Sequence, residues 1–142
     1  RHHIMTCQDP LVDVLVHPYW FNEKEFQRKG FPLFDSMKPV PKSYAVELGQ
    51  VAAETGTAVE INAGAGLIKG QGREEFDKEY FEYLTVVAEQ GTMFAIGSDA
   101  HRLDGLKDAL DARNVAEALG LGLDRIWRPS VAPLFGPGAQ GN

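Results

Sequence analysis

Short apolar runs alternate with amphipathic segments along most of the chain. Three of the apolar runs are rich in Val, Ile or Phe and are bounded by turn residues. Runs of this kind predict buried strands, at about Val12 to His17, Thr57 to Asn62 and Met93 to Ser98. We therefore expect three buried strands.

Three other segments have the periodicity of amphipathic helices. Apolar positions recur with helical spacing over about 41–55, 73–90 and 109–119. A proline stands in the first turn of the first segment, and a glycine follows each segment, as is typical of helix starts and ends. These residues are Pro41, Gly56, Gly91 and Gly120.

The alternation of strands and helices predicts an α/β fold built from right-handed parallel βα units. Three strands leave both sheet edges open, whereas a closed barrel needs about eight. Either a partner supplies further strands or the chain is a portion of a larger domain. The aromatic-rich stretch 19–40 interrupts the alternation. We expect an ordered loop there, with a short helix near Glu23 to Arg28, and a surface tail over 129–142.

Composition narrows the classes of function. The chain has 142 residues and a net charge of −6, and the charge argues against binding to a nucleic-acid backbone. Its single cysteine, Cys7, excludes an intrachain disulfide and favours a reducing, cytoplasmic compartment. No apolar run reaches the roughly 20 residues of a membrane helix, and no secretory signal is expected.

Candidate chemistry follows the predicted strands. His17, Asn62, Asp99 and His101 all stand at or just beyond a strand end. In parallel α/β folds the carboxyl ends of the strands form the ligand-binding face. A carboxylate and an imidazole placed there can bind a divalent metal or polarise a water molecule. The alternatives are a buried structural His17 and a helix-capping Asp99, with Asp104 as a competing cap.

Two charged residues close to these motifs, Arg102 and Glu60, are each open to two interpretations. Arg102 could clamp a phosphate through its planar guanidinium, or it could be a solvated arginine at a helix start. Glu60 shares a strand face with Asn62. It is either a buried carboxylate, paired with Lys69 or Arg102, or a glutamate at an exposed sheet edge.

The glycines between Asn62 and Gly70 raise a nucleotide-binding alternative. The third glycine comes one residue late for a dinucleotide fingerprint, and the helix begins only near Arg73. Pyrophosphate binding needs the helix N-terminus at the glycines themselves. A site loop is the preferred interpretation.

Three of these motifs together resemble the PHP domain, the polymerase and histidinol phosphatase superfamily. They are the stretch ending in His17-Pro-Tyr-Trp-Phe, the stretch Val59-Glu-Ile-Asn62 and the stretch Ile96-Gly-Ser-Asp99-Ala-His101. The resemblance covers roughly residues 11–120. It implies a distorted seven-stranded β/α barrel and a metal-dependent phosphoesterase that uses zinc, manganese or iron.

The resemblance also implies roles for individual residues. His17 matches the late His-Pro metal ligand, and Asp99 and His101 match the final Asp-x-His pair, which would also carry catalysis. Asn62 matches a position that lines the site, and Arg102 would contact the substrate phosphate. The implied substrate is a small phosphorylated molecule.

The chain lacks the opening His-x-His motif of that family, its further histidines and its bridging glutamate. We therefore interpret residues 1–128 as the C-terminal part of a PHP-like domain with an incomplete ligand set. The N-terminal part of the same protein or a second copy of the chain would complete the site. Alone, the chain is expected to be weakly active or inactive. The alternative is a shortened, non-catalytic PHP-like interaction module.

Overall fold

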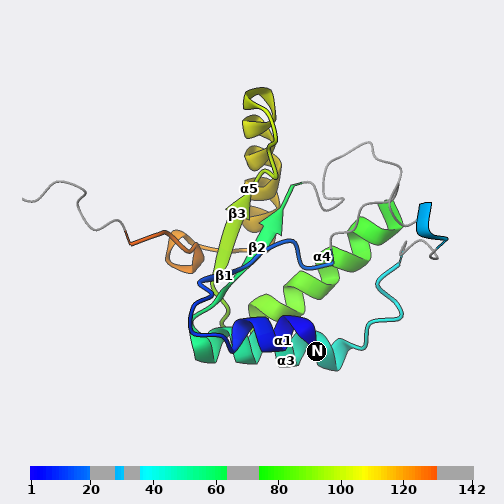
Figure 1. Cartoon of the computed structure of the whole chain (residues 1–142), viewed down its shortest axis with the longest axis vertical. Helices are drawn as coiled ribbons and strands as arrows, with labels where there is room; N and C mark the ends of the chain where they lie inside the picture. Colours follow the sequence, from blue (N-terminus) through cyan, green and yellow to red (C-terminus); the bar gives the residue numbers. More distant parts are fainter. Residues whose placement is uncertain (20–27, 31–35, 64–73, 131–142) are drawn as a thin grey trace, which may run out of the picture.

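A three-stranded parallel sheet organises the fold (Figure 1). The computed structural model describes residues 1–19, 28–30, 36–63 and 74–130. The strands are β1 (Val14–Leu15), β2 (Ala58–Asn62) and β3 (Phe94–Gly97), in the spatial order β1-β2-β3. Because all three strands run the same way, their carboxyl ends lie at one edge of the sheet.

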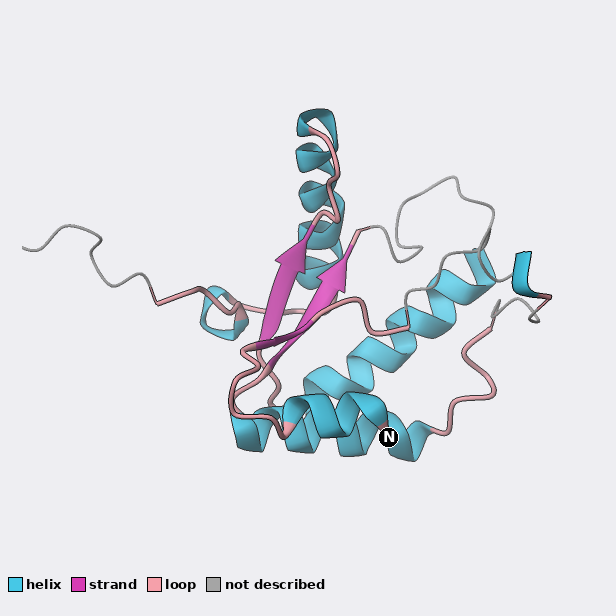
Figure 2. Ribbon diagram, in the orientation of Figure 1, coloured by secondary structure: helices cyan, strands magenta, loops and turns pink. Residues whose placement is uncertain are grey.

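Helices connect and cover these strands (Figure 2). α1 (His2–Cys7) precedes β1, α3 (Lys42–Thr55) leads into β2, and α4 (Glu74–Glu89) leads into β3. The 3₁₀-helix η1 (Leu103–Asp108), α5 (Ala109–Ala118) and the 3₁₀-helix η2 (Leu123–Arg125) follow β3. The expected α/β class with parallel strands is therefore confirmed. The described residues form three strands, so the barrel stays a prediction.

The predicted helix ends are confirmed by the backbone. Gly56, Gly91 and Gly120 have left-handed φ angles of 75°, 91° and 71°, just beyond α3, α4 and α5. Glycine adopts this conformation at little cost, so it terminates helices efficiently. Pro41 is the N-cap of α3. The sequence did not predict η1, which places a tighter 3₁₀ segment before α5.

The first strand is shorter than predicted. The apolar run from Val12 to His17 suggested six strand residues, whereas β1 contains Val14 and Leu15 only. The strand cannot continue beyond this point, because His17 has a φ of 49° and Pro18 lacks the amide hydrogen needed for strand pairing. The early end turns the chain at the edge of the sheet where the candidate site lies.

The core lies around β2, all of whose residues are buried. α3 packs against α4, α1 packs against α3, and α5 packs against β2 and β3. The residues that α3, α4 and α5 bury include Leu48, Ala52, Phe76, Leu84, Val87, Ala112 and Ala116. Together, η1 and α5 project beyond the carboxyl ends of the strands (Figure 1).

Several expectations fall on residues that the structure does not describe. These are the glycine loop over 64–70, most of the short helix near 23–28, and the tail beyond residue 130. Within the described ranges, no helix has both the length and the apolar character that crossing a membrane requires.

Candidate functional site

Two of the predicted metal ligands lie side by side at the carboxyl edge of the sheet. His17 follows β1 and Asp99 follows β3, and the Nε2 atom of His17 is 3.3 Å from the Oδ1 atom of Asp99. Because β2 separates these two strands, the contact bridges the end of β2. The side chains are 42% and 22% exposed, respectively, so a small ligand can reach the pair from solvent. His17 is therefore not the buried histidine of the alternative interpretation.

The backbone of this pair is strained. His17 and Asp99 have φ angles of 49° and 54°, and Tyr19 has a φ of 63°. Within the described ranges these are the three non-glycine residues with positive φ. Such conformations cost of order 1–3 kcal/mol each and are concentrated at functional sites. Asp99 is also not a helix cap, since the N-cap of η1 is Arg102.

Glu60 is a buried carboxylate between the two halves of this site. It lies on β2, is 9% exposed, and accepts a hydrogen bond from the backbone N–H of His17 at 2.8 Å. The same oxygen, Oε2, accepts a bond from the amide of Asn62 at 3.2 Å. Of the two interpretations left open for Glu60, the exposed sheet edge is wrong, because β2 is the central strand.

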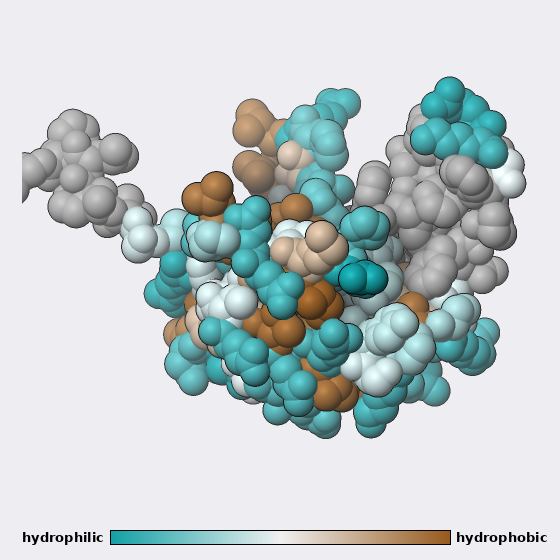
Figure 3. All heavy atoms as spheres, turned by 60° about the horizontal axis from the view of Figure 1, so that its bottom comes forward, coloured by the Kyte–Doolittle hydropathy of each residue, from teal (hydrophilic) through white to brown (hydrophobic). Residues whose placement is uncertain are grey.

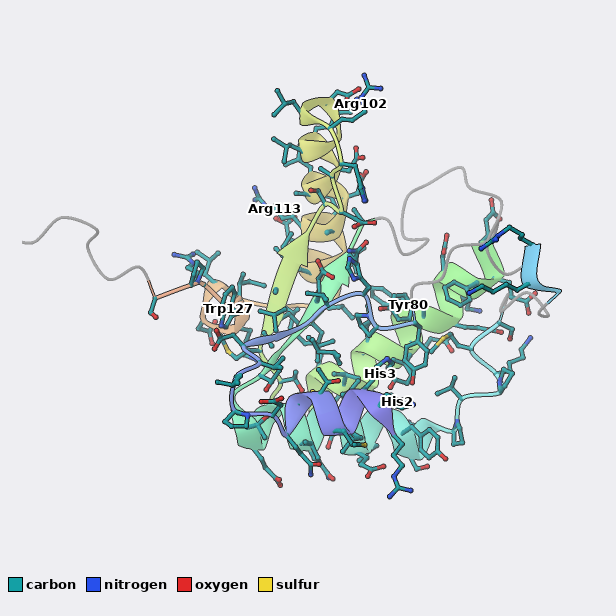
Figure 4. The ribbon with its side chains drawn as sticks, in the orientation of Figure 1. His2, His3, Tyr80, Arg102, Arg113 and Trp127 are labelled. Atoms are coloured by element: carbon teal, nitrogen blue, oxygen red, sulfur yellow. The ribbon has the colours of Figure 1, made fainter. Side chains whose placement is uncertain are left out.

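The expected cationic partner of Glu60 is not Arg102. The Arg102 side chain is 84% exposed and lies 3.5 Å from Asp104, and Lys69 falls outside the described residues. Figure 4 shows Arg102 at the outer end of the projecting η1–α5 segment. Its exposure fits the solvated interpretation, and phosphate binding by Arg102 stays a prediction.

Three tyrosines hold the turn that contains His17. The hydroxyl of Tyr80 on α4 donates to the carbonyl oxygen of Pro18 at 2.8 Å. The hydroxyls of Tyr19 and Tyr83 lie 3.2 Å apart and share a hydrogen bond. Burial raises the pKa values of Tyr80 and Tyr83 well above that of an ordinary phenol. Both phenols are therefore neutral hydrogen-bonding groups at neutral pH (Figure 4 labels Tyr80).

The remaining two predicted site residues, His101 and Asn62, make contacts other than the one between the His17 and Asp99 side chains. His101 is exposed, and its Nδ1 atom lies 2.8 Å from the carbonyl oxygen of Asp99. Asn62 is fully buried, with its amide turned to Glu60. His101 as a metal ligand and Asn62 as a substrate contact stay predictions.

The donor atoms of the pair suit a divalent ion such as zinc, manganese or iron. Imidazole nitrogen and carboxylate oxygen are ordinary ligands for these metals. Two ligands each about 2.1 Å from one ion lie roughly 3.0–3.4 Å apart in octahedral or tetrahedral geometry, and the observed separation is 3.3 Å. No third His, Cys, Asp or Glu of the described chain joins them to form a metal-binding group. The pair therefore fits part of a metal site.

Sequence reasoning did not assign site roles to Glu60, Tyr80 or Gly97. A signal existed for Glu60, since this charged residue stands between the apolar residues Val59 and Ile61 of a predicted buried strand. A methyl group on Gly97 would overlap the Oε1 atom of Glu60, so the glycine leaves room for this carboxylate. Tyr80 carried no signal beyond its place on the buried face of a helix.

Comparisons of the chain with protein families, with curated proteins and with solved structures found no match.

Proposed function

We propose that the chain is the C-terminal portion of a metal-dependent phosphoesterase of the PHP type. The observation that supports this proposal is the contact between His17 and Asp99, which are 82 residues apart in sequence. Both side chains leave the carboxyl ends of parallel strands, where α/β enzymes bind their ligands. Among the residues that the structure describes, the three non-glycine residues with positive φ are this pair and Tyr19, and such strain is typical of a functional site.

In this proposal His17 and Asp99 hold a zinc, manganese or iron ion through one nitrogen and one oxygen. A bound divalent ion would lower the pKa of a coordinated water and stabilise negative charge on a phosphate ester. His101 keeps its proposed roles as a metal ligand and as the catalytic partner of Asp99: if Nδ1 donates to the carbonyl of Asp99, Nε2 is left as an acceptor that solvent or a metal can reach. Arg102 and Asn62 keep their proposed substrate-binding roles.

The proposed site needs ligands that the described residues do not supply. One nitrogen and one oxygen hold a divalent ion weakly, because structural and catalytic sites use three or four protein ligands. We propose that the N-terminal part of the same protein, or a second copy of this chain, completes the set within a barrel. The substrate is a small phosphorylated molecule, in keeping with the net charge of −6.

Residual phosphatase activity tests this proposal. Hydrolysis of p-nitrophenyl phosphate is measured for the 142-residue chain with added Mn²⁺ or Zn²⁺ and with a chelator. We expect weak, metal-dependent turnover that falls to the uncatalysed rate in His17→Ala and in Asp99→Ala. His2→Ala is the matched control, because His2 is an exposed histidine on α1. Turnover that both site variants retain would contradict the proposal.

A non-catalytic interaction module is the second candidate. It is favoured by a row of exposed leucines on η1 and α5, where Leu103, Leu106 and Leu110 are 87%, 58% and 60% exposed. Figure 3 shows hydrophobic surface on this projecting segment. Exposed apolar residues in a row are typical of interaction surfaces. This candidate predicts neither turnover nor metal binding that depends on His17 and Asp99, whereas the phosphoesterase portion binds metal through this pair even where its turnover is too weak to detect.

A further inference from the structure

The burial of the Glu60 carboxylate is energetically costly. A carboxylate among apolar neighbours loses its hydration, and this loss is tolerated only when hydrogen bonds or ion pairs replace the water. Among the described residues no cation pairs with Glu60. Its carboxylate accepts hydrogen bonds from the backbone N–H of His17 and from the side-chain amide of Asn62. These two hydrogen bonds, rather than a salt bridge, compensate for the burial of Glu60, and the first of them holds the backbone at His17.

The first contact fixes the exit from β1. The N–H of His17 points at Glu60 Oε2 at 2.8 Å, while the His17 backbone is left-handed. A non-glycine residue keeps that conformation only when its surroundings hold it there. The carboxylate holds the N–H side of the residue, and the Tyr80 hydroxyl holds the carbonyl of the following Pro18. The imidazole is consequently directed toward Asp99.

The second contact reaches the exit from β3. The Oε1 atom of Glu60 fills the space where a side chain on Gly97 would stand. Gly97 is the last residue of β3 and lies two positions before Asp99. One carboxylate on the central strand thus touches both segments that carry the metal-ligand pair.

We propose that Glu60 is a positioning residue that sets the distance between His17 and Asp99. The expected effect on metal affinity rests on the proposed function, whereas the hydrogen bond from His17 to Glu60 can be tested without metal. Removing a residue that orients metal ligands typically lowers metal affinity by about 10–100-fold.

The test compares Glu60→Met with Glu60→Gln in the full chain. Methionine keeps a long side chain but accepts no strong hydrogen bond, whereas glutamine keeps a carbonyl oxygen able to accept from His17. Ile61→Ala is the matched control, since Ile61 is a fully buried neighbour on β2 whose side chain points to the opposite face. Zn²⁺ affinity is measured by calorimetry, and the His17 amide resonance is followed by NMR without metal.

We expect Glu60→Met to weaken Zn²⁺ binding about 10–100-fold and to move the His17 amide proton upfield. Glu60→Gln is expected to stay close to the unsubstituted chain in both measurements, and Ile61→Ala to lower stability without moving the His17 amide. An unchanged His17 amide in folded Glu60→Met would overturn the inference.

A second measurement needs no substitution and covers the case in which Glu60→Met fails to fold. In the unsubstituted chain, a scalar coupling across the hydrogen bond should join the His17 amide nitrogen to the Glu60 carboxyl carbon. Its absence would overturn the inference. If the unsubstituted chain binds no Zn²⁺, the proposed function fails, while the two amide measurements still decide the role of Glu60.

Discussion

At the scale of single residues, the candidate site depends on side chains that occupy unfavourable backbone conformations. Asp99 has a φ of 54°, and the left-handed region is disfavoured for residues with a Cβ atom. Aspartate tolerates it better than most residues do. The backbone conformation that brings the Asp99 carboxylate to His17 therefore lowers the stability of the fold. Functional sites commonly lower stability in this way.

Two substitutions at Asp99 should separate these effects. We expect Asp99→Gly to be more stable than Asp99→Ala by about 1 kcal/mol, because only glycine relieves the positive φ. Both variants should lose the contact with His17 and bind Zn²⁺ equally weakly. Urea denaturation gives the free energies of unfolding. Equal stabilities of the two variants would show that Asp99 is not strained.

Gly97→Ala should be disruptive although the added group is a single methyl. The methyl group would overlap Oε1 of Glu60, so the carboxylate must move away from His17. We expect a loss of about 1–3 kcal/mol in the free energy of unfolding. Gly105→Ala is the control, because the nearest atom to its methyl group would be the Ala100 side chain at an ordinary 3.4 Å. A Gly97→Ala protein as stable as this control would contradict the packing described for Glu60.

At the scale of elements, the hydrophobic pattern predicted what depends on local sequence. The three helices ended at the expected glycines because a left-handed C′ residue is encoded in one position, as at Gly56. The end of β1 was only partly predictable: Pro18 limits the strand from the sequence, whereas the left-handed backbone of His17 accompanies contacts with the distant Glu60 and Tyr80. The His17–Asp99 pair was predictable from strand ends, whereas the contact of the His101 ring with the Asp99 backbone carbonyl was not.

The contact between α3 and α4 provides a prediction at this scale. A methyl group on Gly49 of α3 would lie 2.6 Å from the Gln90 Cγ atom and 2.8 Å from the Val87 carbonyl oxygen. Alanine favours helix by about 1 kcal/mol over glycine, yet we expect Gly49→Ala to destabilise the protein by about 1–3 kcal/mol because the helices must separate. Gln50→Ala, at an exposed position of α3, is the control for thermal unfolding. Stabilisation by Gly49→Ala would refute this close approach.

At the scale of the whole molecule, the buried tyrosines link stability to alkaline pH. Burial raises the pKa of Tyr83 above the ordinary value of 10.0, so the folded protein keeps a proton that the unfolded chain loses. The stabilisation is complete below pH 10 and is lost as the pH rises further, because the unfolded state then binds fewer protons.

Tyr83→Phe should therefore reduce the decline in stability above pH 10. The expected reduction approaches about 1.4 kcal/mol per pH unit, the value for one proton. Tyr44→Phe is the matched control, since Tyr44 is exposed and should leave the slope unchanged. The slope comes from urea denaturation at several pH values between 9 and 11. An identical slope in the two variants would contradict the neutral, buried state of Tyr83.

Direct measurement of bound metal tests whether His17 and Asp99 together bind a divalent ion. Protein that has never met a chelator is dialysed against Zn²⁺ or Mn²⁺, and metal per chain is determined by elemental analysis for the unsubstituted chain, His17→Ala, Asp99→Ala and the control His2→Ala. We expect weak, saturable binding that both site variants lose and the control keeps. Binding that survives both site substitutions, or no binding by the unsubstituted chain, would contradict this expectation.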